Sequence, residues 1–442
     1  RKGPVLIDIP MDLQRKTIDP NKLKSFIPPK QKNKKNNKLI SQIKTVIRKM
    51  EIAKRPVILI GGGIRLSKTT KELKNFLKKI KVPLLTTWSG VDAIDHFDNN
   101  YIGNIGVYGS RSANFVIQNS DFVLSLGSRL DTRVTGGVPK NFARNAVVAS
   151  VDIDKNELIK KRGLNINIKI NESLNNFFYE FEKYSRNKYI NKSDWVKKAL
   201  KWKIKYPIVL EEFRKQKKYV NPYFFMEKLS KHFDEDEVIV ADDGAHLTWA
   251  IQTLKVTKKQ RLFSAFGNSP MGYAFPAALG SSIALNKKRI ICIDGDGSIQ
   301  INIQELQTMV ANKLPIKIII MNNNGYGIIK QFQELYLKKR FIAVDSSQGV
   351  TNPNFSKIAK AYGINYSEIK NNNQIDKILK KSINTKKPEI IDVFVKPDQK
   401  IIPKLTFGSP LEDLSPLLPR KEFNNNMIVR KVKRLKNHKE SN

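Results

Sequence analysis

Short apolar runs recur along the chain, and each is followed by a glycine-rich or polar stretch and then by a segment with helical spacing. The runs 56–60 and 122–126 are typical, because they contain almost no polar residue and are too short to be helices. Such runs indicate strands that are buried on both faces of a parallel sheet. Their alternation with helical segments predicts an α/β protein of consecutive parallel-sheet domains with helices on both faces.

The predicted elements form two groups, separated by a lysine-rich helical stretch over 171–218. We therefore expect a central domain at 38–185, a helical connector at 186–220 and a second α/β domain at 221–396. The first group has strands at 56–60, 83–87, 122–126 and 146–153 and helices at 38–53 and 69–81, and the second has strands at 237–241, 290–293, 316–321 and 389–395 and a helix at 301–312.

The two ends of the chain follow a different pattern. Residues 3–10 predict one strand, closed by Pro10, with no helix or strand before it. Residues 17–37 predict a linker, because Pro20, Pro28 and Pro29 interrupt any helix there. The segment 397–442 is a tail with several prolines and leucines, and we expect part of it to pack as a loop or short helix over another surface.

Charge and cysteine content narrow the class of protein only slightly. The 442 residues carry a formal net charge of +40, and the lysines are spread along many predicted helix faces instead of one basic arm. Because no known nucleic-acid-binding motif accompanies this charge, we expect a solvated surface and no specific nucleic-acid partner. No apolar run approaches the ~18–20 residues that a membrane span needs. The single cysteine, Cys292, excludes an internal disulfide framework and fits a cytoplasmic protein.

Candidate chemistry lies where two predicted strands of the second domain end. Gly295-Asp296-Gly297-Ser298 follows one strand, and Asn322 to Gly327 (NNNGYG) follows the next. Adjacent parallel strands would bring Asp296 and Asn323 to the same carboxyl edge of the sheet, where ligands bind in open α/β folds. A carboxylate, an amide oxygen, a backbone carbonyl and phosphate oxygens suit Mg²⁺. The alternative is an ordinary turn, since Asn and Gly are common there.

This motif pair resembles the metal and diphosphate motif of thiamine-diphosphate enzymes, and the acetolactate synthase large subunit is the most similar family. Further stretches fall in that family's order, namely RPVILIGGG at 55–63, GSRLDTRVTG at 127–136, VDID at 151–154, MGYAFPAALG at 271–280 and QFQ at 331–333. The resemblance implies decarboxylation of pyruvate and condensation with a second 2-keto acid to acetolactate, in branched-chain amino-acid biosynthesis.

The resemblance also implies that 3–10 is the last strand of an N-terminal pyrimidine-binding domain, so that the sequence given would lack most of this domain. In this family the glutamate that activates the cofactor belongs to that domain. We therefore nominate no catalytic residue and expect the fragment alone to be inactive.

Cofactor-binding residues are carried over from the same motifs. His246 would donate a hydrogen bond to a phosphate oxygen, unless it is only a histidine in a helix-start loop. Met271 would prop the cofactor's two rings, unless it is only core filler. Asp296, Asn323 and the carbonyl of Gly325 would hold Mg²⁺. The full set expected at thiamine diphosphate is Gly244, His246, Met271, Gly295, Asp296, Gly297, Ser298, Asn323, Gly325, Tyr326, Gly327 and Ile328.

The resemblance places a second nucleotide in the central domain. Gly61, Gly62, Gly63, Arg129 and Asp152 match an FAD site, although related thiamine enzymes bind ADP or nothing there.

Two residues bear on the second substrate. Arg133 matches an arginine near the acceptor-substrate pocket, with a surface ion pair as the alternative. Phe332 stands where the family usually has Trp, and Ile328 where it usually has Met. A smaller aromatic ring leaves more room, so the substrate could be a different 2-keto acid, an acyl-CoA or a modified sugar.

The expected assembly is a homodimer or homotetramer, with a small regulatory subunit as a further partner, because each site in this family is built across two chains. Three alternatives stay open. One is another thiamine-diphosphate-dependent 2-keto-acid decarboxylase or lyase. The second is a truncated, non-catalytic nucleotide-binding homologue. The third, a polyanion-binding protein, depends only on the net charge.

Overall fold

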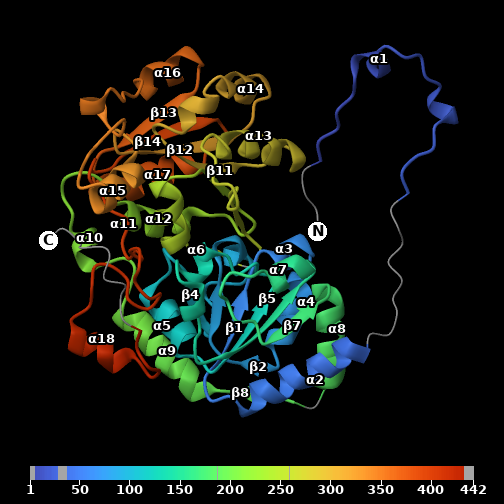
Figure 1. Cartoon of the computed structure of the whole chain (residues 1–442). Coiled ribbons are helices and arrows are strands. Elements are labelled where there is room, and N and C mark those ends of the chain that lie inside the picture. The colour runs from blue at the N-terminus through green and yellow to red at the C-terminus, as the bar shows by residue number, and fades with distance from the viewer. Residues whose placement is uncertain (1–4, 28–36, 187, 258, 433–442) are drawn as a thin grey trace.

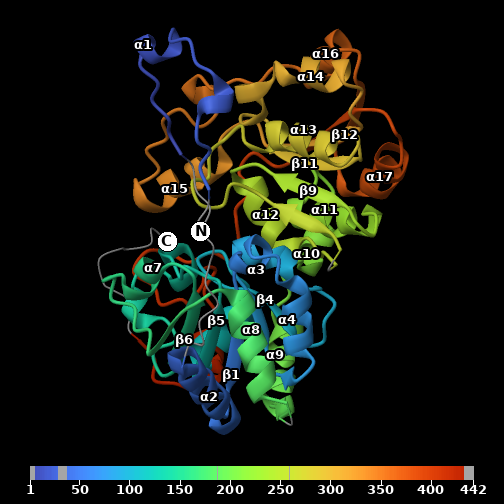
Figure 2. The same ribbon diagram turned by 90° about the vertical axis from the view of Figure 1, so that its right-hand side faces the viewer.

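The computed structural model describes residues 5–27, 37–186, 188–257 and 259–432 and contains two six-stranded sheets (Figure 1). The first sheet has the order β4-β3-β1-β5-β6-β7 and the second β10-β9-β11-β12-β14-β13, and neighbouring strands in both sheets run parallel. Figure 2 shows the two domains one above the other. The predicted fold class is therefore confirmed.

The strands of the first domain are β1 Pro56–Ile60, β3 Leu84–Thr86, β4 Tyr101–Asn104, β5 Phe122–Leu126, β6 Val147–Asp152 and β7 Ile168–Asn171. One face of its sheet is covered by α2 Asn37–Ile52, α4 Thr70–Leu77 and α8 Leu174–Tyr184, and the other by α5 Arg111–Asn119 and α9 Ser193–Lys205. Short elements between them are α3 Gly63–Leu66, α6 Thr132–Thr135, α7 Lys155–Ile159, α10 Glu211–Arg214 and the paired β2 Ile80–Lys81 and β8 Ile190–Asn191.

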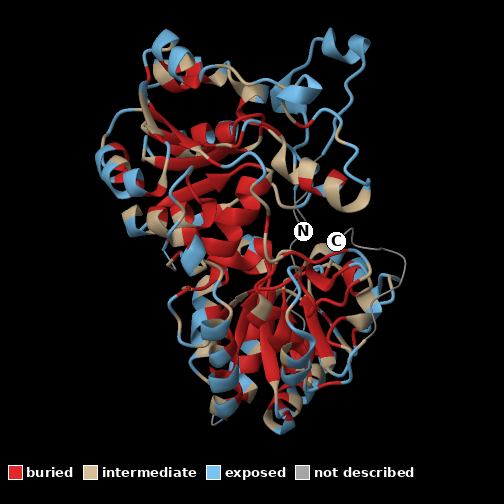
Figure 3. Ribbon diagram, turned by 90° about the vertical axis from the view of Figure 1, so that its left-hand side faces the viewer, coloured by how far each residue is buried: buried red, intermediate tan, exposed pale blue. Residues whose placement is uncertain are grey.

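The strands of the second domain are β9 Val238–Ala241, β10 Arg261–Phe263, β11 Ile290–Gly295, β12 Ile316–Asn322, β13 Asn365–Ile369 and β14 Glu389–Phe394. One face carries α11 Pro222–Leu229, α12 Ala245–Thr253 and α17 Ile375–Ile383, and the other α13 Ala274–Ala284, α14 Glu305–Ala311 and α16 Phe355–Ala361. Helix α15 Gly327–Tyr336 follows the NNNGYG segment. The central strands are buried on both faces in each sheet (Figure 3), which explains their continuous apolar runs.

Four sequence predictions about elements are wrong. The helix expected at 69–81 is shorter, because α4 ends at Leu77 and residues 80–81 form β2. Residues 5–10 are extended but pair with no strand, and Leu6 is 94% exposed. No neighbouring strand among the described residues offers them hydrogen bonds, and residues 3–4 of the predicted strand lie outside the described ranges. The helix expected at 301–312 begins only at Glu305, after a 3₁₀ turn at Ile299–Asn302. The stretch 171–218 is not one helical run, because β8 separates α8 from α9.

The C-terminal tail returns to the first domain. Leu411, Leu414 and Phe423 are buried in the same apolar core as α5 and α9, and the last of them lies on α18 Arg420–Asn426. The amide of Asn114 on α5 donates to the carbonyl of Leu411 at 2.9 Å. The tail therefore packs over another surface, as predicted, and joins the second domain to the first (Figure 1).

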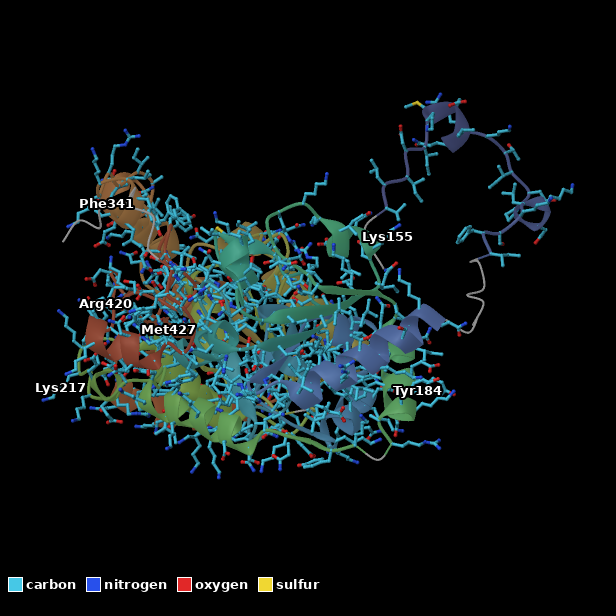
Figure 4. The ribbon with its side chains drawn as sticks, turned by 60° about the horizontal axis from the view of Figure 1, so that its bottom comes forward. Lys155, Tyr184, Lys217, Phe341, Arg420 and Met427 are labelled. Carbon is cyan, nitrogen blue, oxygen red and sulfur yellow. The ribbon has the colours of Figure 1, made fainter. Side chains whose placement is uncertain are left out.

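Positive charge is spread around the molecule. Lys155 and Lys217 point outward from opposite sides in Figure 4. None of the helices within the described ranges combines the length and the apolar composition needed to cross a membrane. The short helix α1 Met11–Gln14 and the exposed segment around it project away from both sheets in Figure 1.

Candidate active site

Three neighbouring strands of the second sheet end at one edge and carry the candidate residues. Ile293 of β11 lies opposite Ala241 of β9, and Gly295 of β11 opposite Met321 of β12. The loops that start at Asp242, Asp296 and Asn323 therefore leave the sheet side by side. The order of the sheet reverses between β9 and β11, and such reversal points form ligand crevices in open α/β sheets.

Asp296 is buried at this edge with its carboxylate held by backbone and amide donors. One oxygen accepts from the N–H of Gly297 at 3.0 Å, and the other from the N–H of Gly325 at 3.0 Å and from Asn352 at 2.8 Å. Burial raises the pKa of Asp296 to about 7, despite these donors. The structure thus brings the GDGS loop and the NNNGYG loop into direct contact, and a cation would stabilise the charged carboxylate there.

The two candidate asparagines have different surroundings. Asn322 donates to Asp392 at 3.0 Å and so faces the neighbouring strand β14. Burial raises the pKa of Asp392 to about 6, although Asn322 and Tyr366 hydrogen-bond to it. Asn323 is 7% exposed and lies against Gly327. This arrangement favours Asn323 as the ligand and Asn322 as its structural neighbour.

Glycine is required at two positions where the loops touch. A Cβ on Gly325, whose φ is +153°, would lie 2.3 Å from the carbonyl oxygen of Val344. A Cβ on Gly297 would lie 2.3 Å from the ring of Tyr326. A side chain at Gly297 would therefore push the GDGS loop away from the NNNGYG loop, and one at Gly325 would push the NNNGYG loop away from Val344. Ser298, on the same loop, is buried, whereas Ile328 is half-buried against the core of the domain.

His246 lies in the first turn of α12, and its ring is enclosed by glycines. A Cβ on Gly244 or on Gly295 would approach the His246 ring to 2.5 and 2.8 Å. Its buried Nε2 has no hydrogen-bond partner within the described ranges. Burial lowers the pKa of His246 to about 4, so the imidazole is neutral on its own. A phosphate oxygen at Nε2 would reverse this shift, because nearby negative charge favours the protonated ring.

We therefore expect His246→Leu to weaken diphosphate binding by ~10–100-fold, the usual effect of losing one hydrogen bond to a charged group. His246→Gln keeps an N–H donor and should recover part of the loss. Calorimetric titration of thiamine diphosphate with Mg²⁺ measures both variants. Equal affinity of His246→Leu and the unaltered protein would show that His246 only fills the helix-start loop.

Two further polar residues support the site without having been assigned from sequence. Asp242 accepts from the N–H groups of Gly272, Tyr273 and Ala274 at 2.7–2.8 Å and so caps α13. Asp294 accepts from the hydroxyl of Ser298, and burial and Asp242 raise its pKa well above the usual range. These two carboxyls and His246 place ligand atoms within 4.8 Å of one another. Because Asp242 already accepts from three backbone N–H groups, we assign the two carboxyls to positioning the loops.

Of the two substrate candidates, Arg133 lies where the domains meet. Arg133 donates to the carbonyl of Phe266 at 3.0 Å and to Ser269 at 2.9 Å, and its guanidinium lies 5.3 Å from the ring centre of Trp88. These hydrogen bonds hold Arg133, and not the surface ion pair that the sequence offered as the alternative. The same segment, two residues after Ser269, carries half-buried Met271. Phe332 is 39% exposed.

The candidate nucleotide residues of the first domain also share one sheet edge. Gly61 follows β1, Arg129 follows β5, and Asp152 ends β6. A Cβ on Gly61 would lie 2.3 Å from the carbonyl oxygen of Gly127, and Gly63 donates to that oxygen at 2.9 Å. Gly62 packs in the same way on Ser89. These glycines are thus explained by close backbone packing, and Arg129 pairs with Asp131 at 3.6 Å.

Comparison with known proteins identifies both domains. Residues 43–177 match the model of the thiamine pyrophosphate enzyme central domain, and residues 242–393 match that of the C-terminal TPP binding domain. The chain is 31% identical to the acetolactate synthase large subunit of Cyanidium caldarium over 414 residues, which are 92% of this chain and 69% of that protein. It is 28% identical to the isozyme 2 large subunit of Escherichia coli strain K12 over 434 residues, covering 97% and 72%.

Both domain models and the extended similarity point to one family, and the sheet edge built around Asp296 lies inside the matched C-terminal domain. This chain belongs to the thiamine pyrophosphate enzymes, in the family of the acetolactate synthase large subunits.

Proposed function

We propose that this protein binds thiamine diphosphate through Mg²⁺ at the Asp296 edge and condenses 2-keto acids, with pyruvate as donor and acetolactate as product. The observation that carries the proposal is the contact of the Asp296 carboxylate with the Gly325 loop, beside His246, whose Nε2 has no partner among the residues that the structure describes. The carboxylate of Asp296, the amide of Asn323 and the buried ring nitrogen of His246 fit a metal-bound diphosphate. Gly244 and Gly295 keep the space beside His246 free of side chains.

Each residue has a definite part in this proposal. Asp296, Asn323 and the Gly325 carbonyl would hold Mg²⁺, and His246 would bind a phosphate oxygen. Met271 would support the rings of the cofactor. When bound, thiamine diphosphate supplies the carbanion-stabilising chemistry, while the protein supplies orientation and charge compensation. Arg133 would bind the carboxylate of the acceptor, because a guanidinium matches a carboxylate with paired donors.

Several finer features belong to the same proposal. The shared sheet edge at Gly61, Arg129 and Asp152 supports FAD in the first domain. The similar proteins are large subunits, which supports a small partner subunit. We also propose that the protein is a homodimer or homotetramer and that it lies in the cytoplasm.

Acetolactate formation from pyruvate by the protein isolated from its own cells tests the proposed activity. From the protein as its own cells make it, and not from the given sequence expressed alone, we expect product with Mg²⁺ and none after chelation with EDTA. Thiamine-diphosphate-dependent release of CO₂ without acetolactate would overturn the condensation and indicate a decarboxylase or lyase instead.

Phe332 favours this second candidate, because its surroundings are open. Its ring lies 5.0 Å from that of Tyr336 and 6.1 Å from that of Phe407, so three aromatic side chains cluster on one surface. Phe332→Trp adds ring area and should shift the ratio of products formed from competing acceptor keto acids by roughly 10-fold, the usual effect of one extra methylene-sized group in an apolar pocket. An unchanged ratio would mean that Phe332 only packs. Tyr362→Trp, on α16's end, is a control outside this cluster.

A further inference from the structure

A cavity lies between the two domains and is lined by none of the residues assigned above. Its volume is about 220 Å³. It is lined by β4 and the start of α5 from the first domain, by the end of α9 and residues 206–209, and by the end of α12 from the second domain. It therefore lies at the opposite end of α12 from His246.

Two buried side chains in the lining have unsatisfied polar atoms. Asn104 is 3% exposed and Thr253 is 7% exposed. In the part of the chain that the structure describes, neither Nδ2 of Asn104 nor the hydroxyl of Thr253 has a hydrogen-bond partner. A buried polar group without a partner destabilises a protein, so such groups indicate a missing ligand or water. Both groups are hydrogen-bond donors, and both residues line the cavity.

The charges around the cavity are predominantly positive. Lys203, Arg214 and Lys255 line it, and the one carboxylate in the lining, Glu227, is paired with Arg214 at 2.9 Å. Lys203 donates to the carbonyl of Tyr101 at 2.5 Å, and no ion pair reaches Lys203 or Lys255 within the described ranges. Burial, and then repulsion by Lys255, lowers the pKa of Lys203. An anion bound in the cavity would offset both the burial of the Lys203 amine and its repulsion by Lys255.

The start of α5 adds a helix terminus to this lining. Ser110 caps the nine-residue helix by accepting from the N–H of Ala113 at 3.2 Å, and Ser112 in the first turn also lines the cavity. The first N–H groups of a helix favour negative charge. The terminus, the lysines and the two unsatisfied donors thus converge from both domains on one space.

We infer that this cavity is a binding site for a small oxyanion, a phosphate or carboxylate group of a small molecule. Its oxygens would accept from Lys203, Asn104 and Thr253. The apolar side chains of Ile208, Val209 and Ile251 would contact any carbon part of the ligand. Because both domains contribute donors, the bound anion would stabilise their junction.

Calorimetric titration with inorganic phosphate, at constant ionic strength, tests the site. Lys203→Met and Thr253→Val should each lower phosphate affinity, the first by at least ~10-fold, as expected for the loss of a charged hydrogen-bond donor. Lys201→Met, an exposed lysine on the same helix, is the matched control and should bind as the unaltered protein does. Circular dichroism checks that the variants fold. If Lys203→Met does not fold, the phosphate affinity of the isosteric Thr253→Val carries the test.

Phosphate can also reach the diphosphate site, so dependence on Lys203 or Thr253 is the criterion. Acetate, titrated in the same way, distinguishes a carboxylate site from a phosphate site, and Lys203-dependent binding of either anion supports the inference. Unchanged affinity in both variants, or no saturable binding of either anion, would overturn it. Loss of the Asp296 site, in contrast, leaves Lys203-dependent binding intact, so the two proposals fail separately.

Discussion

Asp296→Ala is expected to abolish Mg²⁺-dependent binding of thiamine diphosphate. The substitution removes the one carboxylate that contacts both the GDGS loop and Gly325, and it leaves Asn352 without its acceptor. Without that negative charge, Mg²⁺ loses its strongest ligand. The site then lacks the positive centre that attracts the cofactor's diphosphate. Affinity should fall by at least ~100-fold, the upper end for losing a charged ligand group.

The matched control is Asp236→Ala. Asp236 lies just before β9, at the opposite edge of the same sheet, and its side chain is 67% exposed. Calorimetric titration of both variants with thiamine diphosphate, with Mg²⁺ and with EDTA, separates a metal effect from a general charge effect. Normal Mg²⁺-dependent affinity in Asp296→Ala would remove Asp296 from the metal site.

Lys317→Met is expected to lower the free energy of unfolding by ~3–5 kcal/mol, the cost of breaking a buried ion pair by removing one partner. Lys317 is fully buried in β12, where its amine donates to Thr385 at 2.5 Å and to the carbonyl of Lys387 at 2.7 Å, 3.6 Å from Glu389. Glu389 is itself only 4% exposed, so its carboxylate would be left buried without the amine. Urea unfolding measures the loss.

Two controls distinguish this account from a simple packing defect. Lys377→Met, on the exposed face of α17, should change stability little. Adding Glu389→Gln to Lys317→Met should restore part of the loss, because it removes the unpaired charge. A double variant that is no more stable than Lys317→Met would contradict the role of the charge.

The pH dependence gives an independent readout of Lys317. Burial lowers its pKa to about 8 in the folded protein, whereas a lysine in an unfolded chain titrates near ~10.4. Between these values the unfolded state binds more protons, so the contribution of Lys317 to stability rises with pH from about 8 to ~10.4. Lys317→Met should lose this rise, and an unchanged slope would show that another group causes it.

Continuous apolar runs made the strands predictable. Pro56–Ile60 and Phe122–Leu126 have the predicted bounds, because strands buried on both faces need apolar side chains at every position. The run at 3–10 has the same composition, but a strand also needs a neighbour to hydrogen-bond with, and composition does not report neighbours. For the same reason the buried Lys317, inside an isoleucine-rich run, had no signal in the sequence.

Short motifs placed the candidate site but not its support. Asp296 and Asn323 stand in adjacent loops, as the GDGS and NNN motifs predicted. Asn352, which donates to Asp296, belongs to no motif and is far along the chain, so only the fold reveals it. Asp242 was visible beside Gly244, but its role as the cap of α13 depends on a contact across 30 residues. The sequence also carried no sign of the cavity that Asn104 and Thr253 share.

The thiamine diphosphate content of the protein, isolated from its own cells and quantified after denaturation, tests the central claim most directly. The account predicts about one molecule of thiamine diphosphate per chain, which dialysis against EDTA removes, since the metal holds the diphosphate. Protein that contains no thiamine diphosphate, and takes up none when it is supplied with Mg²⁺, would contradict it.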